Sequence, residues 1–304
     1  MRKTVMIFGV SSFLGSNLLE ALASHYRIIG VFHKTTVDLP NVLTIRCDVL
    51  KKDNVNRLIA LFRPDVTVYA AGLSNITACH ANPKLADALN SAGLINVCSS
   101  AERFGSKFVF VSSSYVLAGE DVVYHESDTP FPATVYGSSL ASSEFYVQKS
   151  CLNYIIFRSC PLYGRAYHPT RSNWFEPIEL ALAQGRTVAL DDRVEHGCLD
   201  VQILARVIRL AIEKGVTNRL FQITTRDTAS RYDFARSYAK VFGRDEDLIT
   251  RAQWKFPIDT GHFRKQALER YVFKMDTKNA EEYFGLRFPS IEESLLATKK
   301  RLAG

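Results

Sequence analysis

The fold is decided near the N-terminus by an apolar run that ends in a glycine-containing turn. The stretch reads Thr4-Val5-Met6-Ile7-Phe8-Gly9-Val10-Ser11-Ser12-Phe13-Leu14-Gly15. Its first five residues predict a buried strand, and leucines at helical spacing predict a helix from Phe13 to Ser24. This order is typical of dinucleotide-binding turns, in which pyrophosphate lies on the helix N-terminus. Because Ser12 holds the central glycine position, the turn alone also fits an ordinary strand-to-helix connection.

The rest of the first half alternates between strand and helix patterns. Apolar, β-branched runs predict strands over 27–32, 42–46, 66–71, 107–112 and 154–158. Helical spacing predicts helices over 53–62, 83–104 and 133–150. Continuously apolar strands that alternate with helices predict an α/β fold, with a doubly wound parallel sheet covered on both faces.

After about residue 165 the pattern loosens. Helices are predicted over 174–184, 201–214, 231–242, 278–284 and 291–301, with short strands and loops between them. No linker separates the two halves. We therefore expect a nucleotide-binding domain over 1–165 and a smaller C-terminal α/β lobe over 166–304, with some segments interleaved and a cleft between them.

Composition bounds the class of protein. The chain has 304 residues, a mass of 34.2 kDa, 47% hydrophobic and 23% charged residues, values ordinary for a soluble globular protein. It has no apolar run long enough to span a membrane, and glycine and serines interrupt the apolar N-terminus too early for a signal peptide. The six cysteines show no metal-binding spacing and suggest reduced thiols of a cytoplasmic protein without a metal.

The net charge of +7 and the isoelectric point of about 9.0 raise the question of a nucleic-acid partner. The basic residues are scattered, however, and no zinc-finger or RNA-binding pattern is present. We therefore expect no nucleic-acid partner, and a basic cleft for an anionic small molecule fits the charge better.

The end of the second predicted strand bears on cofactor choice. An acidic residue there would bind an adenosine 2′-hydroxyl, whereas a basic residue accommodates a 2′-phosphate. His33 and Lys34 stand at this place and favour NADP over NAD, although Lys34 also fits a solvated loop lysine. Asp48 follows the third strand and is placed to contact the adenine edge.

Several further segments resemble the extended short-chain dehydrogenase/reductase family, with the closest likeness to the dTDP-4-dehydrorhamnose reductase and NAD-dependent epimerase/dehydratase branch. The matching residues share the family's order and spacing over roughly 3–165. They are Pro64-Asp65-Val66, Ala70-Ala71-Gly72, Asn90, Val111 to Val116, Tyr124 to Glu126, Pro130, Pro132, Tyr136 to Leu140, Glu144, and Arg158 to Gly164.

The resemblance implies a Rossmann-type domain for NADP(H) and a C-terminal lobe for a nucleotide sugar. Cofactor contacts are implied for Gly9, Ser11, Ser12, Phe13, Leu14, Gly15, His33, Lys34, Asp48, Val49, Ala70, Ala71, Gly72, Asn90, Val111, Tyr136 and Pro161. Substrate contacts are implied for Ser74, Tyr115, Arg193 and His196. A homodimer formed through the helices near 83–104 and 133–150 is implied as well.

The family's catalytic site combines a Ser/Thr with a Tyr-x-x-x-Lys pair, and here Ser113 and Tyr136 match the hydroxyl and the tyrosine. The lysine position holds Leu140, which cannot carry charge or bind ribose hydroxyls. An unassisted tyrosine has a pKa of about 10. Lys149 lies about 13 Å further along the helix axis and is no obvious substitute. Leu140 also fits a helix residue that simply packs on the sheet.

Three interpretations therefore stay open. The protein is a reductase with altered or weakened catalysis, or it performs other chemistry on the same kind of ligand, or it is a non-catalytic nucleotide-binding regulatory or partner subunit. The third has a parallel in the β subunit of methionine adenosyltransferase, although that subunit retains the lysine.

A few other polar groups are candidates for the site. Cys79 and His80 follow the fourth strand, where either would serve as a second acid or base, and Tyr115 fits a back-up proton donor or core packing. Arg193 and His196 fit contacts to a substrate diphosphate as well as solvated charge. Trp174 with Phe175, and the segment 261–265, fit a base-stacking pair and a closing loop, or plain packing and surface.

Overall fold

Seven parallel strands form the central sheet of the part of the chain that is described. The structure is a computed structural model, and it describes residues 2–37, 42–167, 171–253, 257 and 268–303. The strand order is β12-β7-β5-β4-β1-β2-β3. The strands are β1 (Thr4–Phe8), β2 (Arg27–Phe32), β3 (Leu43–Arg46), β4 (Val66–Tyr69), β5 (Lys107–Ser113), β7 (Tyr154–Ser159) and β12 (Arg219–Ile223). The predicted α/β class with a doubly wound parallel sheet is confirmed.

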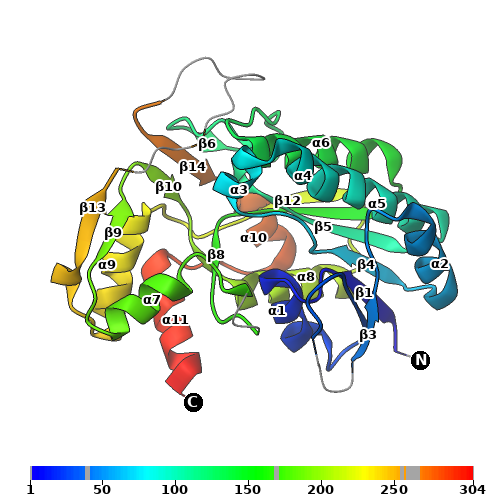
Figure 1. The fold of residues 1–304 in the computed structure, drawn as a ribbon, viewed down its shortest axis with the longest axis horizontal. Helices are drawn as coiled ribbons and strands as arrows, with labels where there is room; N and C mark the ends of the chain where they lie inside the picture. Colours follow the sequence, from blue (N-terminus) through cyan, green and yellow to red (C-terminus); the bar gives the residue numbers. More distant parts are fainter. Residues whose placement is uncertain (1, 38–41, 168–170, 254–256, 258–267, 304) are drawn as a thin grey trace.

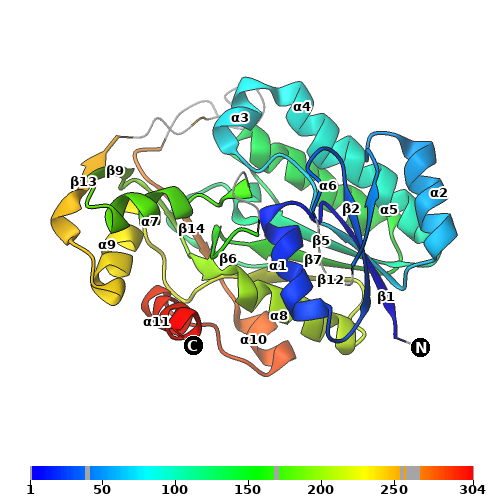
Figure 2. The same cartoon turned by 60° about the horizontal axis from the view of Figure 1, so that its bottom comes forward.

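Helices cover both faces of this sheet, which explains why its strands are continuously apolar. Figures 1 and 2 show α1, α8 and α10 on one face, and α2, α5 and α6 on the other. Their bounds are α1 (Phe13–Leu22), α2 (Lys52–Phe62), α5 (Gly93–Arg103), α6 (Val135–Ser150), α8 (Val201–Glu213) and α10 (Lys278–Phe284). Side chains from Val5 to Phe8 are completely buried between the two layers.

Short polar side chains fix where the helices of the site begin. Ser12 caps α1 by accepting a hydrogen bond from the Gly15 amide at 2.9 Å, and Thr134 caps α6 by accepting one from Gly137 at 3.0 Å. These caps place the first turns of both helices at the carboxyl edge of the sheet, where ligands of doubly wound folds bind.

The second lobe contains smaller sheets with helices packed against them (Figure 1). Its buried aromatic cluster centres on Phe175, Phe234 and Tyr238. Its elements are α7 (Glu176–Ala183), α9 (Arg231–Phe242), α11 (Ile291–Ala303), β9 (Val188–Asp191) and β13 (Ile249–Ala252). Three further strands, β10 (Val194–His196), β14 (Tyr271–Met275) and β6 (Val123–Tyr124), form a sheet, and β8 (Leu162–Tyr163) pairs with β11 (Leu199–Asp200).

The two halves of the sequence are interleaved. Strand β12 and helix α8 come from the second half, yet β12 pairs with β7 and α8 packs against α1. The division at residue 165 into a cofactor unit and a substrate unit stays a prediction. Helix α10 of the second half also packs on β12, and β6 of the first half pairs with β14.

Several elements differ from the sequence prediction in detail. The helix predicted over 83–104 consists of α4 (Pro83–Asp87), a π-helical turn η1 (Ala88–Ala92) and α5. Helix α1 ends at Leu22 and α7 begins at Glu176, so both are shorter than predicted. Helix α3 (Ile76–Ala81) and the 3-10 turns η2 (Ser114–Val116) and η4 (Glu246–Leu248) were not predicted.

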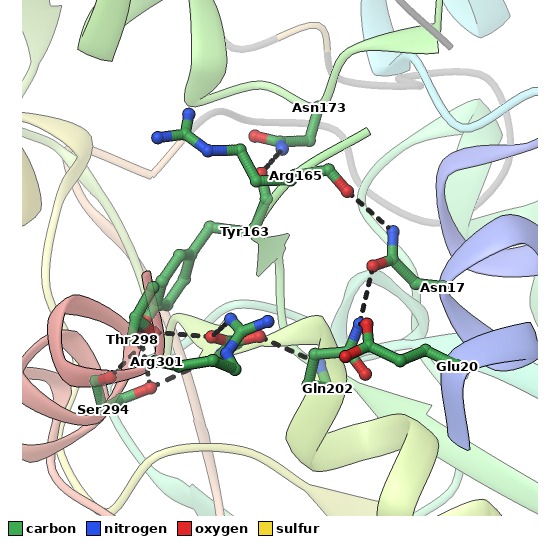
Figure 3. A network of polar contacts seen from close by, with 11 residues as sticks. Asn17, Glu20, Tyr163, Arg165, Asn173, Gln202, Ser294, Thr298 and Arg301 are labelled. Atoms are coloured by element: carbon green, nitrogen blue, oxygen red, sulfur yellow. Dashed lines mark hydrogen bonds and ion pairs between the residues drawn. The ribbon is translucent and has the colours of Figure 1, made fainter. Parts of the chain in front are cut away.

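A buried polar network ties the last helix to the first (Figure 3). Asp200 caps α8 and accepts hydrogen bonds from Thr298 and Arg301 of α11. One turn into the chain's first helix, Asn17 accepts a hydrogen bond from Gln202 at 2.9 Å and donates one to the Arg165 carbonyl at 2.9 Å. The network therefore fixes α11, α8 and α1 to one another.

Among the described helices, none has the length and apolar character needed to cross a bilayer.

Candidate active site

The glycine turn brings β1 and β4 into contact at the carboxyl edge of the sheet. Gly9 adopts a φ of +88°, and a Cβ at this position would lie 2.5 Å from the Ala71 amide nitrogen. A Cβ on Gly15 would lie 2.1 Å from the Gly9 carbonyl oxygen. Both positions therefore require glycine. Ser12 does not disrupt the turn, because its hydroxyl caps the helix whose first-turn N–H groups would face an anion.

Basic side chains gather at the end of β2. His33 lies 3.9 Å from Asp48, and its carbonyl accepts a hydrogen bond from Arg46 Nε at 3.1 Å. Lys34 is exposed beside them. Arg171, which comes from the second half of the chain, donates a hydrogen bond to the Thr35 hydroxyl at 2.8 Å. Sequence reasoning missed Arg46 and Arg171, because nothing in their local sequence points to β2.

The loop after β4 is held by Asn90. Its side-chain oxygen accepts a hydrogen bond from the Leu73 amide at 2.8 Å, and its side-chain nitrogen donates to the Leu73 carbonyl at 3.1 Å and to Ser139 at 3.0 Å. Ala70, Ala71 and Gly72 thereby lie beside the π-helical turn. Ser74 is exposed on the same loop.

The two residues predicted to be catalytic lie together. Ser113 ends β5, and Tyr136 stands in the first turn of α6. The Ser113 hydroxyl accepts a hydrogen bond from the Tyr115 amide at 3.3 Å, and it lies near enough to the Tyr136 hydroxyl to influence the pKa of that group. Val111 lies two residues earlier on the same strand. A carbonyl oxygen placed between these two hydroxyls would meet both at once.

The environment of Tyr136 keeps its hydroxyl protonated. Burial raises the pKa of Tyr136 well above its usual value, the nearby Cys79 thiol raises it further, and the Ser113 hydroxyl opposes them. No cation among the described residues is part of this balance. Tyr136 is therefore suited to donate a proton and poorly suited to accept one at neutral pH.

Leu140 fills the lysine position with a buried side chain, and it is only 5% exposed. The polar groups around it satisfy one another. Ser143 donates a hydrogen bond to the Asn90 carbonyl at 2.8 Å, and Ser91 donates one to the Ser139 carbonyl at 3.1 Å. The π-helical turn and α6 are thus joined by serine hydroxyls on either side of a leucine.

Other candidates near Tyr136 are set apart by burial or position. Cys79 is fully buried, its thiol donates to the Leu73 carbonyl at 3.2 Å, and burial raises its pKa to about 11. His80 is exposed on α3. Lys149 lies 5.9 Å from the centre of the Phe145 ring at the exposed end of α6 and does not replace the missing lysine.

Tyr115 lies between Tyr136 and a second group of side chains around His196. Its ring centre lies 5.9 Å from that of Tyr136 and 4.6 Å from that of His196. His196 is 5% exposed, and burial, with a further contribution from Arg231, lowers its pKa to about 3. His196 is therefore a neutral side chain and not the basic contact to a diphosphate that the sequence suggested.

A pocket of about 330 Å³ lies beside Tyr115 and His196. Its lining includes Tyr115, Pro161, Trp174, Val194, His196 and Arg231. Arg193 is exposed and does not line the pocket, whereas Arg231, which sequence reasoning missed, does. The ring centres of Trp174 and Phe175 lie 5.4 Å apart. Phe175 belongs to the core of the second lobe, whereas Trp174 also lines the pocket. Segment 261–265, considered as a closing loop, lies outside the described residues.

Two remaining cofactor candidates have structural contacts of their own. The Val49 carbonyl accepts a hydrogen bond from Asn96 at 3.0 Å, and the Pro161 carbonyl accepts one from the Leu199 amide at 3.2 Å. All six cysteines are buried free thiols. Within the described ranges, His, Cys, Asp and Glu side chains form no group of three that would hold a metal ion.

Comparison with known proteins places this chain in a family. The sequence model of the "RmlD substrate binding domain" matches residues 2–303. The dTDP-4-dehydrorhamnose reductase of Escherichia coli (strain K12) is 25% identical over 293 residues, 94% of this chain and 93% of that protein. Methionine adenosyltransferase 2 subunit beta of Rattus norvegicus is 24% identical over 246 residues, 79% of this chain and 72% of that protein.

Solved structures agree on the fold. The crystal structure of dTDP-4-dehydrorhamnose reductase from Bacillus anthracis str. Ames in complex with NADP superimposes with a TM-score of 0.81 at 20% identity, covering 99% of this chain and 100% of the other. The chain belongs to the RmlD substrate binding domain family, on the dTDP-4-dehydrorhamnose reductase and epimerase/dehydratase branch of the extended short-chain dehydrogenase/reductases.

Proposed function

We propose that this chain is an NADP(H)-dependent reductase acting at C4 of a nucleotide-activated 4-keto-6-deoxy sugar. The observation that carries the proposal is that Ser113 and Tyr136 lie together at the sheet edge that also holds the glycine turn. The reductase relatives and the NADP complex of a structural neighbour support the same reaction class.

The residues divide the reaction between them. The turn from Gly9 to Gly15 would hold the pyrophosphate of the cofactor, whose nicotinamide, when bound, supplies the hydride. Ser113 would donate a hydrogen bond to the substrate carbonyl, and Tyr136 would transfer its hydroxyl proton to that oxygen. C4 thereby gains a hydride and the oxygen gains a proton, which gives the alcohol.

Leu140 sets the direction in which this site works best. Without a neighbouring cation the Tyr136 hydroxyl stays protonated, as a reductase needs, whereas oxidation of an alcohol requires a tyrosinate to accept the proton. We therefore propose a reductase with weakened acid–base assistance, in which reduction is favoured over the reverse reaction.

The preference for NADP over NAD is part of the proposal. At the end of β2, where the 2′-position of adenosine would lie, Arg46 contacts the His33 carbonyl, Lys34 follows in the chain, and Arg171 contacts Thr35. Three cations at this position favour a phosphate over a hydroxyl.

Leu140 also favours a second candidate function, a non-catalytic NADP-binding or nucleotide-sugar-binding regulatory subunit. The likeness to methionine adenosyltransferase 2 subunit beta supports it. The two functions are separated by measuring NADPH oxidation with a panel of 4-keto nucleotide sugars, alongside calorimetric binding of NADPH. Turnover that Tyr136→Phe abolishes supports the reductase. Tight NADPH binding without turnover of any panel member supports the regulator.

We further propose a cytoplasmic homodimer that is formed through α4, α5 and α6. Phe145 on α6 is 67% exposed and Leu152 just beyond it is 79% exposed, an apolar surface that a second copy would cover. Light scattering on the wild type and on Phe145→Lys tests this, because a dimer that uses this face becomes a monomer in the variant. A wild-type monomer overturns it.

A further inference from the structure

Two residues that line the pocket beside Tyr115 each have a buried ring nitrogen without a hydrogen-bond partner. The two atoms are Nε1 of Trp174 and Nε2 of His196. A buried polar group without a partner destabilises the fold, so native structures rarely leave one unsatisfied. Two such atoms in residues that line one pocket suggest that a ligand supplies their partners.

The surroundings of His196 leave only one edge of its ring available. Nδ1 lies 3.2 Å from the Ser114 hydroxyl. One face of the ring stacks on Phe273, with the centres 4.4 Å apart and the planes 3° from parallel. The Tyr115 ring packs 4.6 Å away at a tilt. These contacts fix the ring, so the Nε2 edge is held in one orientation before a ligand binds.

Trp174 is held in a similar way. The Arg231 guanidinium lies 5.5 Å from the centre of the indole, and Phe175 and Phe234 pack against it at 5.4 Å and 5.2 Å. The indole N–H can only donate a hydrogen bond, whereas a neutral imidazole nitrogen either donates or accepts. The remaining walls, which include Pro161 and Val194, are largely apolar.

We propose that Trp174 and His196 form a specificity site that reads one hydroxyl group of the substrate's sugar ring. A hydroxyl accepts from an indole N–H and donates to, or accepts from, an imidazole nitrogen, so it is a group of the kind that both atoms can bind. The aromatic and apolar walls suit the C–H faces of a pyranose. The inference rests on the proposed function, because it takes the sugar to lie against Tyr136, one aromatic ring away.

The test is a binding experiment that needs no turnover. The probes are dTDP, dTDP-glucose and dTDP-glucose analogues that each lack one hydroxyl, titrated by calorimetry into the NADP-loaded protein. The variants are Trp174→Phe and His196→Phe, which keep an aromatic ring and remove the hydrogen-bonding atom. His25→Phe, at an exposed histidine outside the pocket, is the matched control.

We expect each of the two variants to bind dTDP-glucose about tenfold more weakly while binding dTDP as the wild type does. One deoxy analogue should lose the same factor in the wild type and no further affinity in the variants. Equal weakening for dTDP and dTDP-glucose would assign the pocket to the nucleotide and overturn the proposal, as would unchanged binding of dTDP-glucose.

Fluorescence gives a second readout that is independent of the variants' stability. In a Trp254→Phe background, Trp174 is the only tryptophan. Its emission should change with dTDP-glucose and stay unchanged with dTDP, and the opposite result contradicts the proposal. If this site behaves as expected while no 4-keto sugar is turned over, the reductase function fails and the sugar-reading pocket stands.

Discussion

Tyr136, in the first turn of α6, lies close enough to Ser113, the last residue of β5, for the Ser113 hydroxyl to lower the pKa of its phenol, against the effect of burial. Removing the Tyr136 hydroxyl deletes the proposed proton donor and leaves the ring in place. Tyr136→Phe should lower kcat by about 10²- to 10⁴-fold, the range expected for losing a general acid. Steady-state NADPH oxidation measures it.

Tyr146 provides the control for this substitution, because it lies on the same helix and its hydroxyl is 2.8 Å from Ser99, away from Ser113. Tyr146→Phe should keep wild-type kcat. If Tyr136→Phe also keeps it, another group supplies the proton.

Leu140→Lys restores the charge that the family pattern contains. A cation within about 4–6 Å of a phenol lowers its pKa by about 1–3 units, so both the rate and its pH dependence should respond. We expect kcat to rise at least about tenfold near neutral pH, with the pH optimum moved downward. The pH–rate profile is the measurement, and Leu140→Met is the size-matched control. A folded Lys variant whose profile equals that of the Met variant would count against the role assigned to this position.

Arg171→Ala should weaken NADPH binding about fivefold and leave NADH binding unchanged, because an exposed guanidinium contributes a modest ion-pair energy to a phosphate. Fluorescence titration with both cofactors gives the ratio. Arg186→Ala, at an exposed position just after α7, should change neither value. Equal losses for NADPH and NADH would place Arg171 away from the 2′-phosphate.

His196 makes stability depend on pH in a defined window. Its pKa is lowered to about 3 in the folded protein, against about 6.5 when unfolded, so below pH 6.5 the unfolded state binds more protons. Stability is therefore lost as the pH falls from about 6.5 towards 3, by about 2 kcal/mol at pH 5. Urea unfolding at pH 7 and pH 5 measures this, and His196→Phe should remove that part of the difference. His80→Gln, at an exposed site, should leave the stability difference between pH 7 and pH 5 unchanged. If His196→Phe also leaves that difference unchanged, His196 is not the titrating group.

Arg158 and Glu144 form an ion pair in the core, with exposures of 2% and 1% and a shortest N–O distance of 2.8 Å. Glu144→Leu leaves the guanidinium buried without its counter-charge, which should cost about 3–5 kcal/mol of unfolding free energy. The double variant Glu144→Leu with Arg158→Met should recover most of that loss in the same urea experiment. A double variant no more stable than the single one would show that the pair does more than neutralise charge.

The parts of this structure that the sequence predicted are those in which neighbouring residues carry the signal. The strand at Thr4–Phe8, the helix at Arg231–Phe242 and the helix at Lys278–Phe284 appear with the predicted bounds, because their apolar periodicity and capping residues are local. Local periodicity does not show which sheet a strand joins. The place of Arg219–Ile223 next to Tyr154–Ser159 therefore had no signal in the sequence.

The same distinction holds for the site. Ser113 and Tyr136 were found through spaced motifs, and the structure brings them together. Arg171 reaches Thr35 from 136 positions away, and Arg231, at the start of α9, reaches the Trp174 ring. Such contacts depend on how lobes pack, which one sequence does not display. The neutral state of His196 was missed for a related reason, because it follows from burial and not from residue type.

The late position of β12 in the chain has a consequence for synthesis on the ribosome. When residues 1–165 have emerged, β7 is an outer strand whose backbone groups on the side of β12 are unpaired, and α8 has not yet covered that face. An apolar strand exposed in this way is a template for aggregation. Folding must therefore wait until residue 223 is free, and a fragment cut at 165 should be recovered from cells as insoluble material.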